Sequence, residues 1–417
     1  MKRKIILIII CVLLALLFIK YKNFFKYFSE QKYYSKLVKY HILKKCYNSD
    51  IDFYDVFAQE GLDYISQNQK TINESLDKLD NLKNTSEKTS KIPTITHKIF
   101  FASSKKTVTL SDYYLENMKV NYTNLNNLGY EWEHNIWVNQ NDLITDEIKA
   151  IKGVKLRDLS ELKDHPMYPV LLDLIDKGAD LKAYLAQASD LFRLILLQKF
   201  GGLYSDMDYE IYDPSYLLSL MKNFDFIGAR EHWSENAYYG NAFLAAKPNH
   251  PILNEAMTRS YRNYHFNILD SSTPNYIKYP CKISDNLYFN GPPLISISYF
   301  KKNNIEGNND IIMPPWMIFN VSFIRYKNET CDLSNISKEF IQDKNSNLES
   351  LLNQFILKPE IIKGQKNDLA RVSAQHENIF YNLKNRNHYR IVGADMFCGS
   401  WTEGASNFKK YYYWNLP

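Results

Sequence analysis

Hydrophobic and polar residues alternate along this chain in patterns typical of strands and helices in turn. Apolar residues occupy nearly every face of a helix over residues 184–200, which indicates a buried helix. Strands are expected at residues 92–101, 131–138, 224–228 and 242–246, and a further helix is expected at residues 142–151. The alternation predicts an α/β fold with a mostly parallel sheet and helices on both faces.

The buried helix carries a polar stripe. Gln187, Asp190 and Arg193 recur every three residues, so they share one side of the helix. A buried Asp and a buried Arg need partners. Two interpretations are open: the two residues only neutralise each other, or they bind a polar ligand. Gly201-Gly202 is expected to end the helix, because glycine accepts the left-handed conformation.

Two carboxylates follow shortly after this stop, in Asp206-Met207-Asp208. We expect an extended segment, in which both carboxylates face one side and Met207 faces the other. Carboxylates held so close repel unless a cation lies between them, and hard oxygen ligands suit Mg²⁺ or Mn²⁺. The alternative is a solvated surface turn without a ligand.

The polar stripe, the glycine stop and the paired carboxylates together are a more specific signal of function than any one of them alone. Ala-Ser-Asp-x-x-Arg, ending at Arg193, is followed by an apolar helix and by Gly-Gly-x-Tyr-x-Asp-x-Asp, ending at Asp208. This pattern resembles the donor-site core of the family 32 glycosyltransferases and, more distantly, of the large clostridial glucosylating toxins. The resemblance implies a GT-A fold, which is Rossmann-like and binds a nucleotide sugar. It further implies a metal-dependent retaining transfer of a hexose from a UDP- or GDP-linked donor to a glycan acceptor, free or linked to lipid or protein.

The resemblance also implies roles for individual residues. Asp208 would bind Mn²⁺ or Mg²⁺ directly, and Asp206 would reach the ribose or the ion through water. Asp190 and Arg193 would hold hydroxyl groups of the transferred sugar. Tyr204 would line the donor pocket.

Segments outside this core resemble the family less closely. In residues 92–100 the family's opening strand is matched by His97 and by Phe100, which stands where a Trp is usual. Phe100 would stack on the nucleotide base with less area than a Trp; the alternative is that both residues belong to the core. Asn241, which precedes the strand at 242–246, would contact the donor or acceptor sugar.

The C-terminal segment departs from the family pattern. Residues 391–403 resemble the family's closing segment, but no His lies within them. The third metal ligand is therefore open between Asp395 and Ser400. Trp401 would close over the donor, with a buried structural Trp as the alternative.

Composition narrows the class of protein. Hydrophobic residues make up 45% and aromatic residues 15% of the 417 residues, as in globular chains. The net charge of +5 is misleading: the first 50 residues hold 11 Lys or Arg and 2 acidic residues, a balance of +9, which leaves 5 − 9 = −4 for the rest. Without basic-aromatic interleaving in the main body, we expect no nucleic-acid partner. The five cysteines are scattered, which argues against a disulfide framework or a zinc site.

The N-terminus is expected to attach the protein to a membrane. Residues 5–19 are apolar and uncharged, preceded by Met-Lys-Arg-Lys and not followed by a small-residue cleavage site. We therefore predict a single-pass anchor at residues 1–22, a basic helical stem and linker at 23–90, and a catalytic domain at 91–417. The charges on both sides of the anchor leave its orientation open.

Alternative functions are open at this stage. Within glycosyl transfer, the acceptor would be a protein, as for a toxin or effector. In other classes, the chain would be a membrane-anchored carbohydrate-binding protein without turnover, or a haloacid-dehalogenase-type phosphatase. The phosphatase motif expects Thr or Val two residues after the second Asp, where this chain has Glu210.

Overall fold

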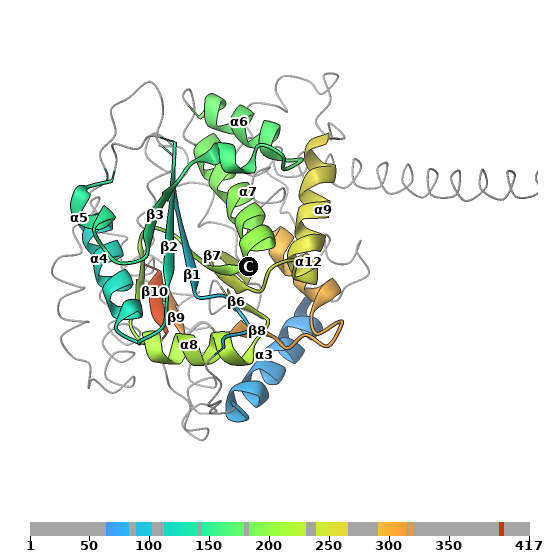
Figure 1. The fold of residues 1–417 in the computed structure, drawn as a ribbon. Coiled ribbons are helices and arrows are strands. Elements are labelled where there is room, and N and C mark those ends of the chain that lie inside the picture. The colour runs from blue at the N-terminus through green and yellow to red at the C-terminus, as the bar shows by residue number, and fades with distance from the viewer. Residues whose placement is uncertain are drawn as a thin grey trace, which may run out of the picture.

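A seven-stranded sheet forms the centre of the molecule, with strand order β3-β2-β1-β4-β7-β6-β8 (Figure 1). The computed structural model describes residues 64–82, 89–101, 110, 112–139, 144–178, 183–230, 239–265, 291–314, 317–320 and 392–395. Its strands are β1 (Ile95–Phe100), β2 (Glu133–Val138), β3 (Val154–Arg157), β4 (Gly202–Ser205), β6 (Phe226–Arg230), β7 (Tyr239–Ala246) and β8 (Asp310–Met313). In this sheet β7 runs antiparallel to its neighbours β4 and β6, and the other pairs are parallel.

Helices cover both faces of this sheet, as the sequence pattern predicts. The described helices are α3 (Tyr64–Asp80), α4 (Asp112–Asn126), α5 (Asp146–Lys149), α6 (Tyr168–Lys177), α7 (Ala183–Phe200), α8 (Pro214–Asn223), α9 (Pro251–His265) and α12 (Pro292–Lys302), with a 3₁₀ turn at Leu159–Leu162. One core lies between the sheet and α6, α7, α9 and α12. Two further cores lie against α3 and α8 and against α4 and α5. The predicted α/β class is confirmed, whereas the helix expected at 142–151 is the single turn α5.

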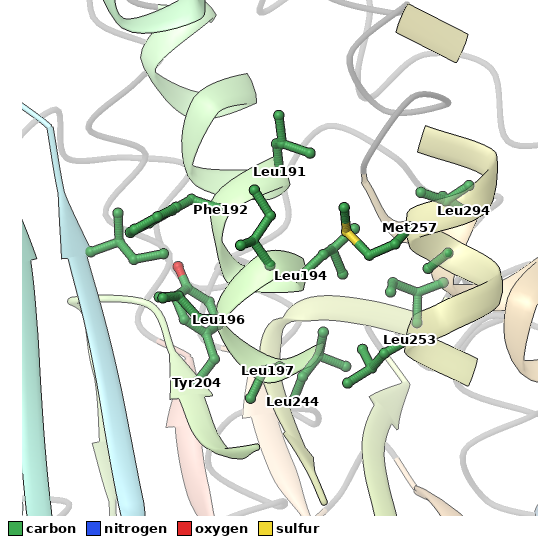
Figure 2. Close-up of a cluster of buried hydrophobic side chains, with 14 of the residues drawn as sticks. Leu191, Phe192, Leu194, Leu196, Leu197, Tyr204, Leu244, Leu253, Met257 and Leu294 are labelled. Atoms are coloured by element: carbon green, nitrogen blue, oxygen red, sulfur yellow. The ribbon is translucent and has the colours of Figure 1, made fainter. Parts of the chain in front are cut away.

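The buried helix of the sequence pattern is α7, at the centre of the largest core. Figure 2 shows Leu194 and Leu197 on the side of α7 that faces Leu253 and Met257 of α9. Burying a Leu side chain contributes roughly 1.5–3 kcal/mol, and these leucines are fully buried. The apolar burial on several sides fixes α7 against the sheet, and with it the polar stripe.

Gly201 and Gly202 connect α7 to β4 in the left-handed conformation, with φ of 66° and 91°. A Cβ on Gly202 would lie 2.5 Å from the carbonyl oxygen of Ile95 in β1. Glycine at this position therefore lets the chain leave the helix and pair with β1 at once. The predicted helix stop is confirmed, and its position pairs Leu203 and Tyr204 of β4 with Thr96 and His97 of β1.

The carboxyl ends of the parallel strands share one edge of the sheet. β1 ends there at Phe100 and β4 ends there at Ser205. Because β7 runs the opposite way, its first residues, including Asn241, start at the same edge. Ligands of open α/β sheets bind outside this edge. The topology therefore brings segments from residues 100, 206 and 241 to one place.

A small second sheet is built on the chain just after Asp208. It has the strand order β5-β10-β9, with β5 (Tyr209–Ile211), β9 (Ile318–Asn320) and β10 (Gly393–Asp395). β10 is antiparallel to β5, and Asp395 pairs with Tyr209. The C-terminal strand thus brings the backbone of Asp395 next to the carboxylate motif.

The part of the expected stem that the structure describes packs on the sheet. Helix α3 contacts β8, and its Leu79 belongs to one of the cores. Lys78 donates a hydrogen bond to the carbonyl oxygen of Asp310 at 2.6 Å, and the Tyr239 hydroxyl donates to Oδ1 of Asn68 at 3.3 Å. The predicted anchor at residues 5–19 lies outside the described residues. Among the helices that the structure describes, none has the length and apolar character needed to cross a bilayer.

Candidate active site

Five of the predicted site residues form one network at the carboxyl edge of the sheet. They are Asp190 and Arg193 of α7, Tyr204 of β4, Asp206, and Asn241 of β7. Backbone pairing fixes their mutual position, because the amide of Asp206 donates to the carbonyl oxygen of Ala242 at 2.8 Å. Segments separated by some 50 residues in sequence therefore meet at one rigid point.

Arg193 is the centre of the network and is itself 4% exposed. Its Nη1 donates to the carbonyl oxygen of Asn241 at 2.6 Å and lies 3.3 Å from Oδ1 of Asp206. Its Nη2 lies 2.9 Å from Oδ1 of Asp190 and 3.3 Å from Oγ of Ser189, and its Nε donates to the Ser189 carbonyl oxygen at 3.3 Å. The guanidinium group thus uses donors on all three of its nitrogens within the protein.

Asp190 is the more accessible partner, with 16% of its side chain exposed. Its Oδ1 also accepts a hydrogen bond from Nδ2 of Asn241 at 3.0 Å. Burial raises the pKa of Asp190 to about 6, and the nearby Asp206 acts in the same direction, whereas Arg193 and Asn241 lower it. Desolvation outweighs the ion pair here. The Asp190–Arg193 pair of the simpler interpretation exists, but it is embedded in a larger network.

Tyr204 and Asp206 complete the network on the β4 side. The Tyr204 hydroxyl donates to Oδ1 of Asp206, and the Arg193 guanidinium lies 4.4 Å from the centre of the Tyr204 ring. Burial and the neighbouring Asp206 carboxylate raise the pKa of Tyr204 well above its usual value, so the hydroxyl stays protonated and keeps donating. Asp206 keeps 35% of its side chain exposed. Tyr204 and Arg193 therefore hold Oδ1 of Asp206, while the exposed part of this carboxylate stays accessible to a ligand.

The two carboxylates lie on a turn, so the expected extended segment is wrong. The amide of Tyr209 donates to the carbonyl oxygen of Asp206 at 3.0 Å, which closes a turn over residues 206–209, called here the carboxylate turn. Met207 is 7% exposed and packs in the core against α4 and α5, and Asp208 is 9% exposed. Burial of the Met207 side chain favours this bend, because an apolar side chain beside two carboxylates gains from the nearby core.

His97 takes the structural alternative of its two interpretations. Its ring is fully buried, Nε2 donates to the carbonyl oxygen of Gly201 at 2.9 Å, and Nδ1 accepts from Nε1 of Trp137 at 3.2 Å. Burial lowers the pKa of His97 to about 4, which keeps the ring neutral. In the structure His97 therefore fixes β1 to the glycine stop, and its contact with the substrate stays a prediction. Phe100 is partly buried at the end of β1 and keeps its two interpretations.

The predicted third metal ligand is placed only by its backbone. Asp395 lies in β10 opposite Tyr209, but its side chain, Ser400 and Trp401 lie outside the described residues. Within the described part of the chain, His, Cys, Asp and Glu form no group of three or more that would hold a metal. The carboxylates of Asp206 and Asp208 match the hard ligands that Mg²⁺ and Mn²⁺ take, which usually comprise one or two carboxylates together with substrate phosphates.

The sequence did not indicate three polar residues that hold the carboxylate turn on the side of α4. They are Lys98 of β1 and Asn117 and Asn121 of α4. All three are buried and bond to backbone atoms of residues 206–211. The one indication in the sequence is Lys98, a charged residue in the middle of a strand that is buried on both faces. Asn117 and Asn121 lie in a helix that contains several other polar residues, so nothing in the sequence marks them.

Comparison with known families identifies a region that contains four of the five network residues, all except Asn241. Residues 116–231 match the family described as the glycosyltransferase sugar-binding region containing a DXD motif. The chain carries a glycosyltransferase region. The matched residues include α7, β4 and the carboxylate turn, and Asp206-Met207-Asp208 is an Asp-x-Asp sequence inside them. The predicted enzyme class is confirmed, while membership of family 32 stays a prediction.

Several solved structures are similar to this chain at low sequence identity. The PaToxG glycosyltransferase is 17% identical, with a TM-score of 0.38 over 57% of this chain and 78% of that one. The UDP-bound glycosyltransferase domain of the YGT toxin is 12% identical, with a TM-score of 0.36 over 54% and 79%. The catalytic domain of alpha-toxin from Clostridium novyi is 11% identical, with a TM-score of 0.33 over 61% and 84%. Comparison with curated proteins gives no match.

Asp190→Asn should change how the stability of this glycosyltransferase depends on pH. The folded-state pKa of Asp190, about 6, exceeds its ordinary value of 3.8, so the folded state binds more protons between these values. The contribution of Asp190 to the free energy of unfolding is then largest at low pH and falls as the pH rises from about 4 to about 6. Because Asn does not titrate, the melting temperature of the variant minus that of the wild type should increase as the pH rises over this range. A difference that stays constant with pH would contradict the burial argument.

Proposed function

We propose that this protein is a metal-dependent, retaining glycosyltransferase with a GT-A fold. It transfers a hexose from a UDP- or GDP-linked donor to a glycan acceptor. The observation that carries the proposal is the carboxylate turn at the carboxyl edge of the sheet, where the Asp206 side chain is 35% exposed beside Arg193 and lies inside the matched region. The matched region favours glycosyl transfer over both a haloacid-dehalogenase-type phosphatase and a carbohydrate-binding protein without turnover.

The carboxylate turn is proposed as the metal site. Asp208 and the open side of Asp206 would hold Mn²⁺ or Mg²⁺, with Asp395 or Ser400 as the third ligand from the protein. When bound, such an ion supplies positive charge to the departing diphosphate. Asp206 is suited to this task because Tyr204 and Arg193 orient its Oδ1, leaving its exposed surface to the ligand.

The other side of the network is proposed as the sugar site. Asp190 is accessible and, when ionised, accepts charge-assisted hydrogen bonds from sugar hydroxyl groups. Asn241 stands beside it and orients it. Arg193 is buried with its donors occupied, so we assign it the positioning of Asp190, Asp206 and Asn241 in place of the direct sugar contact expected from the resemblance. Hydrogen bonds to the sugar hydroxyl groups would position the anomeric carbon next to the acceptor.

The reaction itself is a substitution at the anomeric carbon of the donor. The bond from that carbon to the diphosphate oxygen breaks, and an acceptor hydroxyl oxygen bonds to the carbon on the same face. The proton of that hydroxyl passes to the departing phosphate oxygen. Phe100, at the end of β1, is proposed to stack on the nucleotide base, and Trp401 to close over the donor.

Membrane attachment through residues 5–19 belongs to the same proposal. The basis is sequence alone: an uncharged apolar run after a basic start. After cell lysis without detergent, the full-length chain should sediment with membranes and should be released by detergent and not by salt. Recovery of the intact chain in the supernatant would contradict the anchor.

Turnover should require both the divalent ion and Asp208. A panel of UDP- and GDP-sugars with Mn²⁺ is tested for release of the nucleotide, first without and then with glycan acceptors. Asp208→Asn keeps the shape of the side chain but weakens its bond to the ion, so hydrolysis of the accepted donor should fall by about 10²–10³-fold, as for loss of one group that stabilises transition-state charge. EDTA should abolish turnover of the wild type, and added Mn²⁺ should restore it.

Two controls accompany this experiment. Asp173→Asn removes an exposed carboxylate of α6 and should leave both turnover and metal dependence unchanged. The melting temperature of Asp208→Asn should stay within a few degrees of the wild type, which separates lost chemistry from lost fold. Full activity of the wild type in EDTA would overturn the metal-dependent mechanism.

A further inference from the structure

The backbone of the carboxylate turn is held by side chains that lie on the opposite face of the sheet from Arg193. Lys98 is the first of them: its Nζ donates to the carbonyl oxygen of Asp206 at 2.5 Å. That same carbonyl accepts the amide of Tyr209, which closes the turn. Lys98 thus stabilises the one carbonyl on which the turn depends.

Two asparagines of α4 hold the rest of the turn and the strand after it. Nδ2 of Asn117 donates to the carbonyl oxygens of Met207 and Tyr209 at 2.9 and 3.0 Å. Nδ2 of Asn121 donates to the Tyr209 carbonyl oxygen at 2.9 Å, and its Oδ1 accepts the amide of Ile211 at 2.9 Å. The two side chains are also bonded to each other at 3.0 Å, four residues apart on one helix face. This bond between the two side chains fixes the orientation of both amide groups toward the turn.

The burial of these three residues is informative. Lys98 is 2%, Asn117 is 7% and Asn121 is 2% exposed. Burying an ammonium group and two amides is unfavourable unless hydrogen bonds compensate, and an apolar residue would fill the same space between β1 and α4 without this cost. The compensating hydrogen bonds are made in large part with the backbone of residues 206–211. This segment carries the two carboxylates and then pairs with the strand that contains Asp395.

We propose that Lys98, Asn117 and Asn121 are positioning residues for the metal site, and we call them the clamp residues. They hold the backbone of residues 206–211 so that the carboxylates of Asp206 and Asp208 stay at the separation that a divalent ion and a diphosphate require. The clamp rests on the proposed metal-dependent function. It acts on the main chain, whereas Arg193 and Tyr204 act on the Asp206 side chain. Substituting a residue that holds the ligands of a metal site in place typically lowers the metal affinity by about 10–100-fold.

The decisive experiment measures Mn²⁺ binding to the full chain by electron paramagnetic resonance of the free ion. Lys98→Met keeps the aliphatic side chain and removes the ammonium group, so the dissociation constant for Mn²⁺ should rise about tenfold or more. Lys98→Arg restores a cation and should recover most of the affinity. Asp208→Asn should lose this binding and so shows that the ion measured is the one at the carboxylate turn.

Lys78→Met is the matched control. Lys78 also donates from a partly buried ammonium group to a backbone carbonyl, that of Asp310 at 2.6 Å, but at the amino end of β8. Its loss should lower the melting temperature to a similar degree and leave Mn²⁺ affinity at the wild-type value. A purely structural Lys98 would behave in the same way as Lys78.

Asn117→Leu keeps the proposal testable if Lys98→Met does not fold. It removes both donors to the turn at similar side-chain volume, and the Mn²⁺ dissociation constant should again rise about tenfold or more. Wild-type affinity in either folded variant would overturn the clamp while leaving the proposed function intact. If the wild type instead turns over its donor without binding Mn²⁺, the metal-dependent function fails, and the clamp fails with it.

Discussion

A single buried guanidinium group connects the parts of this site. Arg193 lies where α7, the end of β4 and the start of β7 meet, and it bonds to groups from all three. A charge in such a place requires neutralisation by partners of suitable geometry, because desolvation is expensive. Asp190 and Asp206 supply the opposite charges, so neither carboxylate is free to adopt another position. The electrostatic requirement of Arg193 is thereby also the constraint that orients the polar groups of the site.

The carboxylate turn is held on two faces by different means. On the α7 face, Arg193 and Tyr204 direct the side chain of Asp206. On the α4 face, Lys98 and Asn117 direct the backbone. Catalysis by electrostatic stabilisation depends on charges that are already in place when the reaction occurs. A turn held in this way, with β4 before it and β5 after it, needs little rearrangement when a ligand arrives.

Local patterns of the sequence were sufficient for the elements but not for all their contacts. The apolar run of α7, its glycine stop and the strands around them follow from hydrophobic spacing and from the conformational freedom of Gly202. The bend at Asp206 does not follow, because it depends on a core pocket for Met207 that distant residues build. Lys98 could be noticed in the sequence as a charge inside a strand, yet its partner is a backbone carbonyl 108 positions away. Such pairings require the topology.

The central claim is that Arg193 and Asp190 organise a donor site and are more than an ion pair that stabilises the fold. The double variant Asp190→Asn with Arg193→Met tests it most directly, since it removes both charges at similar volume and avoids the unpaired buried charge that costs roughly 3–5 kcal/mol. Glu255→Gln with Arg259→Met in α9 is the matched control, a pair whose side chains are similarly little exposed, at 20% and 5%. The account predicts that both double variants fold, that the control turns over its donor normally, and that the Asp190–Arg193 variant loses turnover by about a hundredfold or more. Near wild-type turnover in the Asp190–Arg193 variant would contradict the account.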